Sequence, residues 1–397
     1  MKWNNRGHEL EQKAEYFVQN FKAHGEKVYI FGAGLLGKEM MLILDKLGCF
    51  AGFIDNDMAK QQSGFAGKEV LSISDYSNCS MIGLVLIAAN EKNIPSMKKQ
   101  LLEIGLLFGK DFFIASGFRQ EILPLIVYYH CNKVFIDLAQ ISLTERCTLK
   151  CEKCAHACYA VDAKVEDAQL EEVKSTVDLF LSKVDLIGEI ALLGGEPLLY
   201  LNLKQVVTYI GDKHLDKVAI LSITTNGTII PSDELLTVCK QYNVLFRISN
   251  YVEAIPRLRE KYTELIRKLK NWNINYVLAP ESFTWMDYGF DYVDNGGNER
   301  KLLQVFDTCR TPCREIRDEK LYYCIMARSV SDNLNLQAGM NDYLDLTSID
   351  ESNRACLLEY QMGYSEKGYL DMCRYCHGSS AVDYPIPVAK QIERGKN

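Results

Sequence analysis

The chain of 397 residues lacks the features that mark membrane, secreted and nucleic-acid-coating proteins. Its longest apolar run is short, around Leu84 to Ala89, and a membrane span needs roughly 18 such residues. The N-terminal sequence MKWNNRGHELEQ has no apolar signal-peptide core, so we expect a cytoplasmic protein with no membrane partner. A net charge of −7 gives no basic face to neutralise phosphates, which argues against a nucleic-acid partner.

The chain does contain enough apolar residues for packed cores, and it is rich in cysteine. Hydrophobic residues make up 48% of the sequence and charged residues 24%, which excludes a disordered chain. The length suits two or three domains, and we find no internal repeat and no low-complexity linker between them. In a reducing compartment, the 14 cysteines are expected to be metal ligands or catalytic groups rather than disulfides.

Residues 1–125 alternate short apolar runs with helical patterns, which predicts a Rossmann-like parallel sheet with helices on its faces. The expected strands are 27–31, 51–54, 84–89 and 111–115. The first strand leads into a loop that contains Gly32, Gly34 and Gly37, and the second ends at Asp55. This arrangement is typical of a site for nucleotide phosphates, with the carboxylate on a ribose hydroxyl. A plain strand–helix turn is the alternative.

Residues 132–300 repeat the alternation and predict a partial (β/α) barrel, so the fold class is α/β throughout. The expected strands are 134–143, 187–193, 218–224, 244–248 and 274–278. Active sites of such barrels lie at the carboxyl ends of the strands. Three polar turns stand at these ends, namely Gly194-Gly195-Glu196-Pro197, Thr225-Asn226-Gly227 and the turn at Ser249. Each alone is also explained by an ordinary turn, but all three are expected to open on the same face.

A C-x3-C-x2-C motif formed by Cys147, Cys151 and Cys154 follows the first barrel strand. Three thiolates on one loop can ligate three irons of a 4Fe–4S cluster and leave the fourth iron open to a small molecule. Cys158 is an alternative fourth ligand, which would close the cluster for simple electron transfer. Structural zinc is the other alternative, although zinc would prefer a second cysteine pair or histidines, which this loop does not provide.

With these motifs, residues 132–300 resemble the radical S-adenosylmethionine (radical SAM) superfamily. The resemblance implies that the three cysteines hold the cluster and that Gly194 to Pro197 hold the methionyl amino group of S-adenosyl-L-methionine. It also implies that Thr225, Asn226, Gly227 and Ser249 contact the ribose and carboxylate. One position departs, because Lys153 stands where the family often has an aromatic residue near the adenine. A flavodoxin- or ferredoxin-type electron donor is the implied partner.

Residues 301–384 contain a second group of cysteines, Cys309, Cys313, Cys324, Cys373 and Cys376. Four of these thiolates suffice for a second, fully ligated 4Fe–4S cluster, and zinc bound by four thiolates is the alternative. Either Cys309 or Cys313 is the first ligand, and we favour Cys309. The arrangement resembles the auxiliary-cluster extension called a twitch domain, the single-cluster relative of the SPASM domain. We expect Cys356 to be a buried thiol, with hydrogen donation as the alternative.

The resemblance implies an oxidoreductase-like enzyme that reductively cleaves S-adenosylmethionine to a 5′-deoxyadenosyl radical. That radical would abstract hydrogen from a carbohydrate or nucleotide-linked small molecule, in a two-electron oxidation or an epimerisation. The front domain resembles Rossmann-like domains attached to sugar-modifying transferases, which implies a nucleotide or nucleotide sugar, a docking surface or a vestigial fold. The alternatives are maturation of a ribosomally made peptide, and a non-catalytic iron–sulfur or zinc protein with a regulatory nucleotide site.

Overall fold

The computed structural model describes residues 2–3, 9–78, 83–162, 164–280, 284–309, 311–336, 342–365 and 367–392. The chain divides into two compact units. One is Arg6–Asp137, and the other combines Met1–Asn5 with Leu138–Asn397. Within the described residues, no helix combines the length and apolar character that a membrane crossing requires.

The unit Arg6–Asp137 is built on a five-stranded parallel sheet with the order β4-β3-β2-β5-β6. Its strands are β2 (Val28–Phe31), β3 (Phe50–Ile54), β4 (Val70–Leu71), β5 (Leu84–Ile87) and β6 (Phe112–Ile114). Its helices are α1 (Glu9–Ala23), α2 (Leu35–Leu47), α3 (Met58–Ser63), α4 (Ile73–Asn78), α5 (Ile94–Glu103), α6 (Ala115–Gly117), η1 (Phe118–Ile122) and α7 (Leu123–Cys131). β2 and β5 are buried along their whole length, as strands of a sheet covered on both faces must be. The four predicted strands and the parallel arrangement are confirmed.

The second unit contains an eight-stranded sheet with the order β11-β10-β9-β8-β7-β13-β14-β15. Its strands are β7 (Phe135–Ser142), β8 (Leu186–Leu193), β9 (Val218–Thr225), β10 (Leu245–Ile248), β11 (Tyr276–Leu278), β13 (Arg314–Arg317), β14 (Lys320–Tyr322) and β15 (Tyr343–Asp345). β8 to β11 pair in parallel, and β13 pairs in parallel with β7. β14 and β15 continue the sheet in antiparallel pairs. The predicted strands of residues 132–300 are all present.

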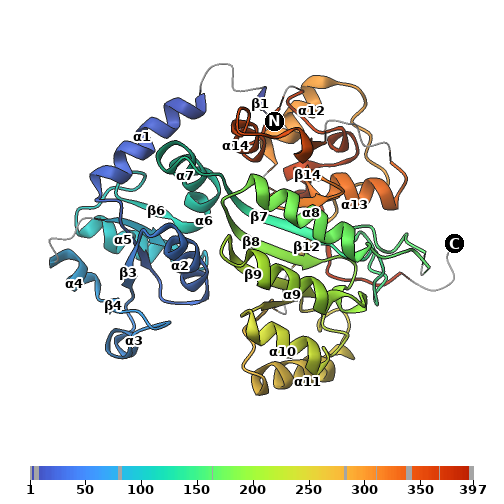
Figure 1. Ribbon diagram of the computed structural model, residues 1–397, viewed down its shortest axis with the longest axis horizontal. Coiled ribbons are helices and arrows are strands. Elements are labelled where there is room, and N and C mark those ends of the chain that lie inside the picture. The colour runs from blue at the N-terminus through green and yellow to red at the C-terminus, as the bar shows by residue number, and fades with distance from the viewer. Residues whose placement is uncertain are drawn as a thin grey trace. The chain divides into compact units, whose positions relative to one another are not determined.

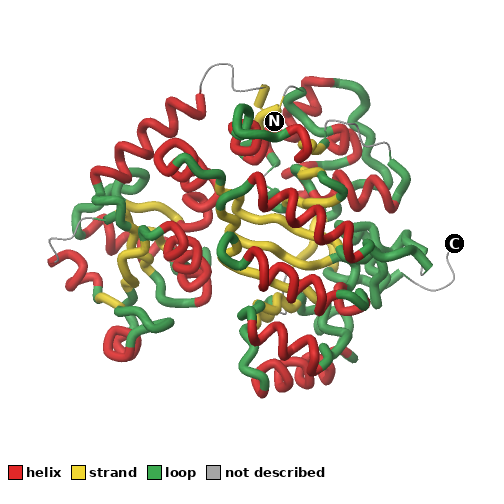
Figure 2. Tube along the Cα trace, viewed as in Figure 1, coloured by secondary structure: helices red, strands yellow, loops and turns green. Residues whose placement is uncertain are grey.

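Helices of this unit cover the outer face of the sheet, as the ribbon and the tube show (Figures 1 and 2). They include α8 (Leu170–Lys183), α9 (Leu203–His214), α10 (Asp233–Gln241) and α11 (Leu258–Asn271). β8 is buried at all eight positions, because it lies in the middle of the sheet. Apolar residues fill most of β8 on both sides of Gly188 and the buried Glu189, and this pattern makes such a strand easy to predict.

The remaining elements of this unit follow β11 along the chain, apart from β1. They are β12 (Thr284–Met286), α12 (Glu299–Thr308), α13 (Ile325–Asn333), η3 (Leu346–Ser348), α14 (Ala355–Gln361), η4 (Asp371–Tyr375), η5 (Gly378–Asp383) and β17 (Pro385–Pro387), with β1 (Lys2–Trp3) paired to β16 (Tyr364–Ser365). Asp318 and Glu319 have φ values of 50° and 64° and form the tip of the predicted hairpin. Residues 301–384 therefore belong to the same compact unit as the barrel strands. α7 packs against α1 and belongs to the first unit, which ends at Asp137.

Candidate functional site

The cysteine loop lies at the carboxyl end of β7 and lines a cavity of about 340 Å³. The same cavity is lined by residues that follow β8, β9 and β10. Of the residues expected at the site, those on the cavity wall are Cys147, Cys151, Cys154, Gly194, Gly195, Thr225, Asn226 and Ser249. The fold thus brings together motifs that lie up to about 100 residues apart in the sequence.

The three thiols of this loop are largely enclosed by protein. Burial raises the pKa of Cys147 to about 11 and that of Cys151 to about 12, and each lies near enough to Cys154 for its charge to contribute. Cys147 and Cys151 therefore stay neutral unless a bound cation stabilises their thiolates. Cys147, Cys151 and Cys154 line one cavity together with the backbone of Gly194 and Gly195. Three thiols arranged in this way fit an iron–sulfur cluster.

Cys158 is buried beside Cys154. A hydrogen bond between the two sulfur groups holds the pKa of Cys154 below its usual range and raises that of Cys158. Cys158 also lines the cavity, so its alternative role as a fourth ligand remains a hypothesis. Among the described residues, no three His, Cys, Asp or Glu side chains lie close enough together to hold a single metal ion.

The two glycines after β8 allow close packing against the cysteine loop. A Cβ at Gly194 would lie 2.2 Å from the carbonyl oxygen of Thr144, and one at Gly195 would lie 2.2 Å from that of Arg146. The N–H of Gly195 donates to Thr144 at 2.8 Å. The sequence suggested that these glycines bring the backbone close to a ligand, and the structure adds a nearer neighbour, the cysteine loop itself.

Glu196 is fully buried and connects the turns after β8 and β9. Its carboxylate accepts hydrogen bonds from the Thr225 hydroxyl at 2.8 Å and from the backbone N–H groups of Asn226 at 2.8 Å and Leu198 at 3.1 Å. Burial raises its pKa to about 7. Glu196 and Pro197, which begins η2 (Pro197–Leu199), are not among the residues lining the cavity, whereas the preceding glycines are.

Tyr262 on α11 supports the turns after β9 and β10, and the sequence analysis missed it. Its hydroxyl lies 2.9 Å from the carbonyl oxygens of Asn226 and Ser249 and accepts the N–H of Tyr251 at 3.1 Å. Gly227 has a φ of 72°, and a Cβ there would lie 2.3 Å from the Tyr262 ring. No local pattern marks Tyr262, because its contacts come from distant parts of the chain.

Lys153 lines the cavity, but its ammonium group is paired with carboxylates. Its Nζ pairs with Asp291 at 2.5 Å and Asp287 at 3.4 Å, and it lies 4.8 Å from the centre of the Tyr292 ring. Aromatic side chains reach the cavity from other segments, namely Tyr251, Trp285 and Tyr288. The rings of Tyr251 and Trp285 meet edge to face at 5.8 Å.

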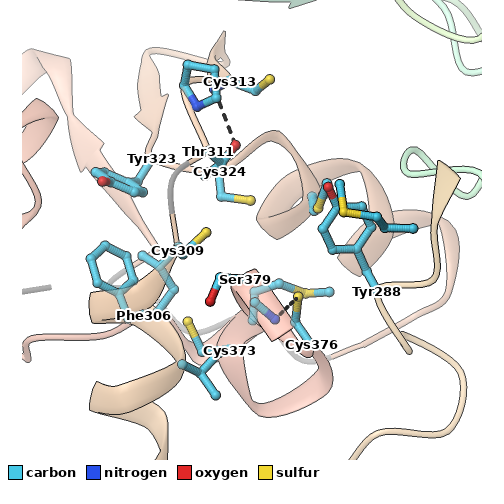
Figure 3. Close-up of a pocket in the computed structure, with 17 residues that line it drawn as sticks. Tyr288, Phe306, Cys309, Thr311, Cys313, Tyr323, Cys324, Cys373, Cys376 and Ser379 are labelled. Atoms are coloured by element: carbon cyan, nitrogen blue, oxygen red, sulfur yellow. Dashed lines mark hydrogen bonds between the residues drawn. The ribbon is translucent and has the colours of Figure 1, made fainter. Parts of the chain in front are cut away.

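The second group of cysteines surrounds another cavity, of about 370 Å³ (Figure 3). Burial raises the pKa values of Cys373 and Cys376 to about 12, and Cys309 contributes to both shifts. Burial also raises the pKa of Cys324, and Cys309 and Cys376 contribute to that shift. These four sulfur atoms therefore lie close together around the cavity.

Cys313 lines the same cavity but differs from the other four cysteines. Figure 3 shows its sulfur pointing away from theirs. It packs against the apolar cluster of Ala191, Leu193 and Ile325. Cys356 lies on α14 and is not among the residues that line either cavity.

In the unit Arg6–Asp137, the glycine loop divides into two structural glycines and one exposed to open space. A Cβ at Gly32 would lie 2.4 Å from Ala88 O, and one at Gly37 would lie 2.0 Å from Gly32 O. At Gly34 a Cβ would meet nothing within 4 Å. The Asp55 carboxylate accepts the N–H of Ala33 at 2.7 Å and that of Asp57 at 2.9 Å, so it binds this loop's backbone.

Comparison with known proteins identifies a domain in the middle of the chain. Residues 141–277 match the sequence model of the radical SAM superfamily. The chain therefore contains a radical SAM domain, a class of domain that holds a 4Fe–4S cluster and binds S-adenosylmethionine.

Particular relatives match over short stretches. GTP 3′,8-cyclase of Stenotrophomonas maltophilia (strain R551-3) is 36% identical over 93 residues, which is 23% of this chain and 27% of that protein. The enzyme of the same name from Syntrophomonas wolfei is 32% identical over 111 residues, 26% of this chain and 31% of that protein. The chain thus spans less than a third of these relatives' length. Among solved structures, BtrN in complex with AdoMet and 2-DOIA has 16% identity and a TM-score of 0.40, and the match covers 63% of this chain and 98% of BtrN.

Proposed function

We propose that this protein is a radical SAM enzyme whose first cluster is held by Cys147, Cys151 and Cys154. The observation that carries this proposal is the 340 Å³ cavity, which the three thiols share with the turns after β8, β9 and β10. When bound there, the cluster and S-adenosylmethionine supply a 5′-deoxyadenosyl radical that takes a hydrogen atom from the substrate.

The chain's own residues hold the cofactor and keep water out. The backbone at Gly194 and Gly195 offers polar groups to the methionyl end, and Ser249 offers a hydroxyl at the end of β10. Tyr251, Trp285 and Tyr288 give an aromatic wall, which suits the adenine in place of the residue that Lys153 replaces. An apolar wall also protects a reactive species from solvent.

Cys309, Cys324, Cys373 and Cys376 are assigned to a second, fully ligated 4Fe–4S cluster. Their sulfur atoms surround the second cavity, and its volume of about 370 Å³ leaves space for such a group. With no open iron it is suited to accepting an electron from a substrate radical, which would make the net reaction a two-electron oxidation. The curated relatives are named for a nucleotide substrate, which supports a nucleotide-linked small molecule as the substrate class.

Anaerobic reconstitution tests both clusters. We expect about eight irons per chain and release of 5′-deoxyadenosine from S-adenosylmethionine. The variant with Cys147, Cys151 and Cys154 all changed to Ala should keep about four irons and lose the cleavage. Cys158→Ala is the matched control and should keep both.

Release of 5′-deoxyadenosine by the triple variant would overturn the assignment of the first cluster. Roughly four irons with stoichiometric zinc in the wild-type protein would remove the second cluster instead. Loss of the first cluster's iron in Cys158→Ala would make Cys158 a ligand.

A further inference from the structure

The segment after β17 lies against the cysteine loop, although about 240 residues separate them in the sequence. Glu152 donates its N–H to the carbonyl oxygen of Lys390 at 2.7 Å, and Ile392 donates to that of Lys150 at 2.8 Å. Cys151 and Gln391 face each other as an antiparallel bridge. The middle of the cysteine loop, at residues 150–152, is therefore held by the segment after β17.

The Gln391 side chain points its amide nitrogen at a cluster ligand. Nε2 lies 3.1 Å from the Sγ of Cys151, and it also donates to the carbonyl oxygen of Ala389 at 2.7 Å. Oε1 accepts the N–H of Lys150 at 2.9 Å. This last bond fixes the orientation of the amide, because turning it over would set two donors against each other.

The sulfur of Cys147 also has amide donors near it, from the cysteine loop and from the turn after β9. Cys147 lies 3.5 Å from both the Nδ2 of Asn226 and the N–H of Leu149. The Gln391 contact is shorter and comes from a segment that makes no part of the barrel strands. It therefore offers a way for the end of the second unit to act on the cluster.

We propose that Gln391 is a positioning residue whose N–H···S bond to Cys151 raises the reduction potential of the first cluster. Negative charge on the ligand sulfurs grows when a cluster takes up an electron. A donor aimed at one of those sulfurs stabilises the reduced form more than the oxidised form. The proposal rests on the proposed function, because it requires the cluster at Cys147, Cys151 and Cys154.

If Gln391 only held the segment in place, other contacts of the same segment would have the same effect on the cluster. The Nζ of Lys390 pairs with the carboxylate of Glu152 at 2.8 Å and is largely exposed. Lys390→Gln removes this ion pair and leaves the amide–sulfur contact in place, so it is the matched control. Gln391→Leu removes the donor, and Gln391→Glu keeps an oxygen for the N–H of Lys150 while removing the N–H that faces the sulfur.

The experiment is a redox titration of the reconstituted full chain, followed by electron paramagnetic resonance. The signal that changes when S-adenosylmethionine is added belongs to the first cluster, and the second cluster serves as an internal reference. We expect the ratio of reduced to oxidised first cluster at a fixed potential to fall roughly threefold or more in Gln391→Leu, and further in Gln391→Glu. Lys390→Gln should match the wild type.

An unchanged reduction potential of the first cluster in Gln391→Glu, with full iron content, would overturn the role of Gln391. The proposed function would still stand. A matching fall in Lys390→Gln would also overturn it, because the effect would then belong to the segment as a whole. If Gln391→Leu fails to retain iron, Gln391→Glu decides the question. A wild-type protein without any signal sensitive to S-adenosylmethionine would overturn the proposed function itself.

Discussion

The hydroxyl of Tyr262 joins two turns of the cavity wall that are formed by different strands. It contacts backbone groups of Asn226 and Ser249, and both residues line the cavity. A buried side chain that satisfies backbone groups in this way fixes where those turns lie. Loss of this hydroxyl should therefore weaken ligand binding as well as the fold.

Tyr262→Phe tests this expectation. Loss of the hydroxyl leaves the buried backbone groups without this partner, so the free energy of unfolding should fall by about 1–3 kcal/mol. The dissociation constant for S-adenosylmethionine should rise severalfold, as measured by equilibrium dialysis. Tyr242→Phe is the control, because its hydroxyl bonds to Asp212 and Tyr242 does not line the cavity. Equal affinities in the two variants would contradict the positioning role of Tyr262.

Single substitutions also test whether Cys309 or Cys313 is the first ligand of the second cluster. Cys309→Ala should lower the iron content by about four per chain, because its sulfur faces Cys324, Cys373 and Cys376. Cys313→Ala should keep the iron and cost only apolar packing. Iron analysis and absorbance after anaerobic reconstitution measure both. The reverse result would make Cys313 the ligand.

At the scale of elements, Asp342 holds the short helix η4, which carries Cys373. Its carboxylate accepts the backbone N–H groups of Asp371 at 2.5 Å and Met372 at 2.9 Å. The side chain is fully buried, and burial raises the pKa of Asp342 to about 7. The ionised form is thus costly in the folded protein.

This raised pKa predicts the direction of a pH dependence. A carboxyl group whose pKa is higher in the folded than in the unfolded state stabilises the fold most when it is protonated. The contribution is therefore lost as the pH rises from about 4 to about 7, by on the order of a few kcal/mol. Asp342→Asn should remove this part of the dependence. Urea unfolding of both proteins from pH 5 to pH 8 measures the difference, and parallel curves would contradict it.

The strands and the cysteine motifs could be predicted because their signals are local. β8 is a run of buried residues, and Cys147, Cys151 and Cys154 follow a strand at fixed spacing. The contacts of Gln391 and Tyr262 could not be predicted, since they join residues 240 and 36 positions away. The spacing also left the first ligand of the second cluster open, because the direction of a side chain depends on its packing.

Asp55 shows the same limit for a polar residue at a strand end. The sequence suggested a carboxylate for a ribose hydroxyl, whereas the carboxylate binds backbone N–H groups of its own and the neighbouring loop. Its Oδ2 also lies 3.3 Å from the Nζ of Lys60. A carboxylate takes the nearest donors, and their positions depend on the folded loop.

At the scale of the whole molecule, the glycine loop and the cysteine loop belong to different compact units. Gly34 is the N-cap of α2, and a Cβ there would meet no atom within 4 Å, which keeps the hypothesis of a phosphate site at that helix end. Binding of a nucleotide at this loop and cleavage of S-adenosylmethionine should therefore respond to different substitutions.

Gly34→Asp tests the phosphate hypothesis. Aspartate is a favourable residue at the start of a helix, so the fold should persist, while its charge should repel a bound phosphate. We expect calorimetry to show loss of nucleotide-sugar binding and no change in 5′-deoxyadenosine release. Gly34→Ala is the control and should retain binding, since its Cβ meets no atom within 4 Å. A wild-type protein that binds no nucleotide from a broad panel would contradict the hypothesis.

The contact between Gln391 and Cys151 can form only late in the synthesis of the chain. During synthesis the cysteine loop is made about 240 residues before the segment that contains Gln391. At roughly 5–20 residues per second, this delay is roughly 10–50 s. For that interval the three thiols lack the segment that later bonds to their loop, so a nascent chain offers them to an assembly machinery more openly than a finished one. Ribosome-bound chains that end before residue 385 should accept iron and sulfide at this loop faster than the released protein.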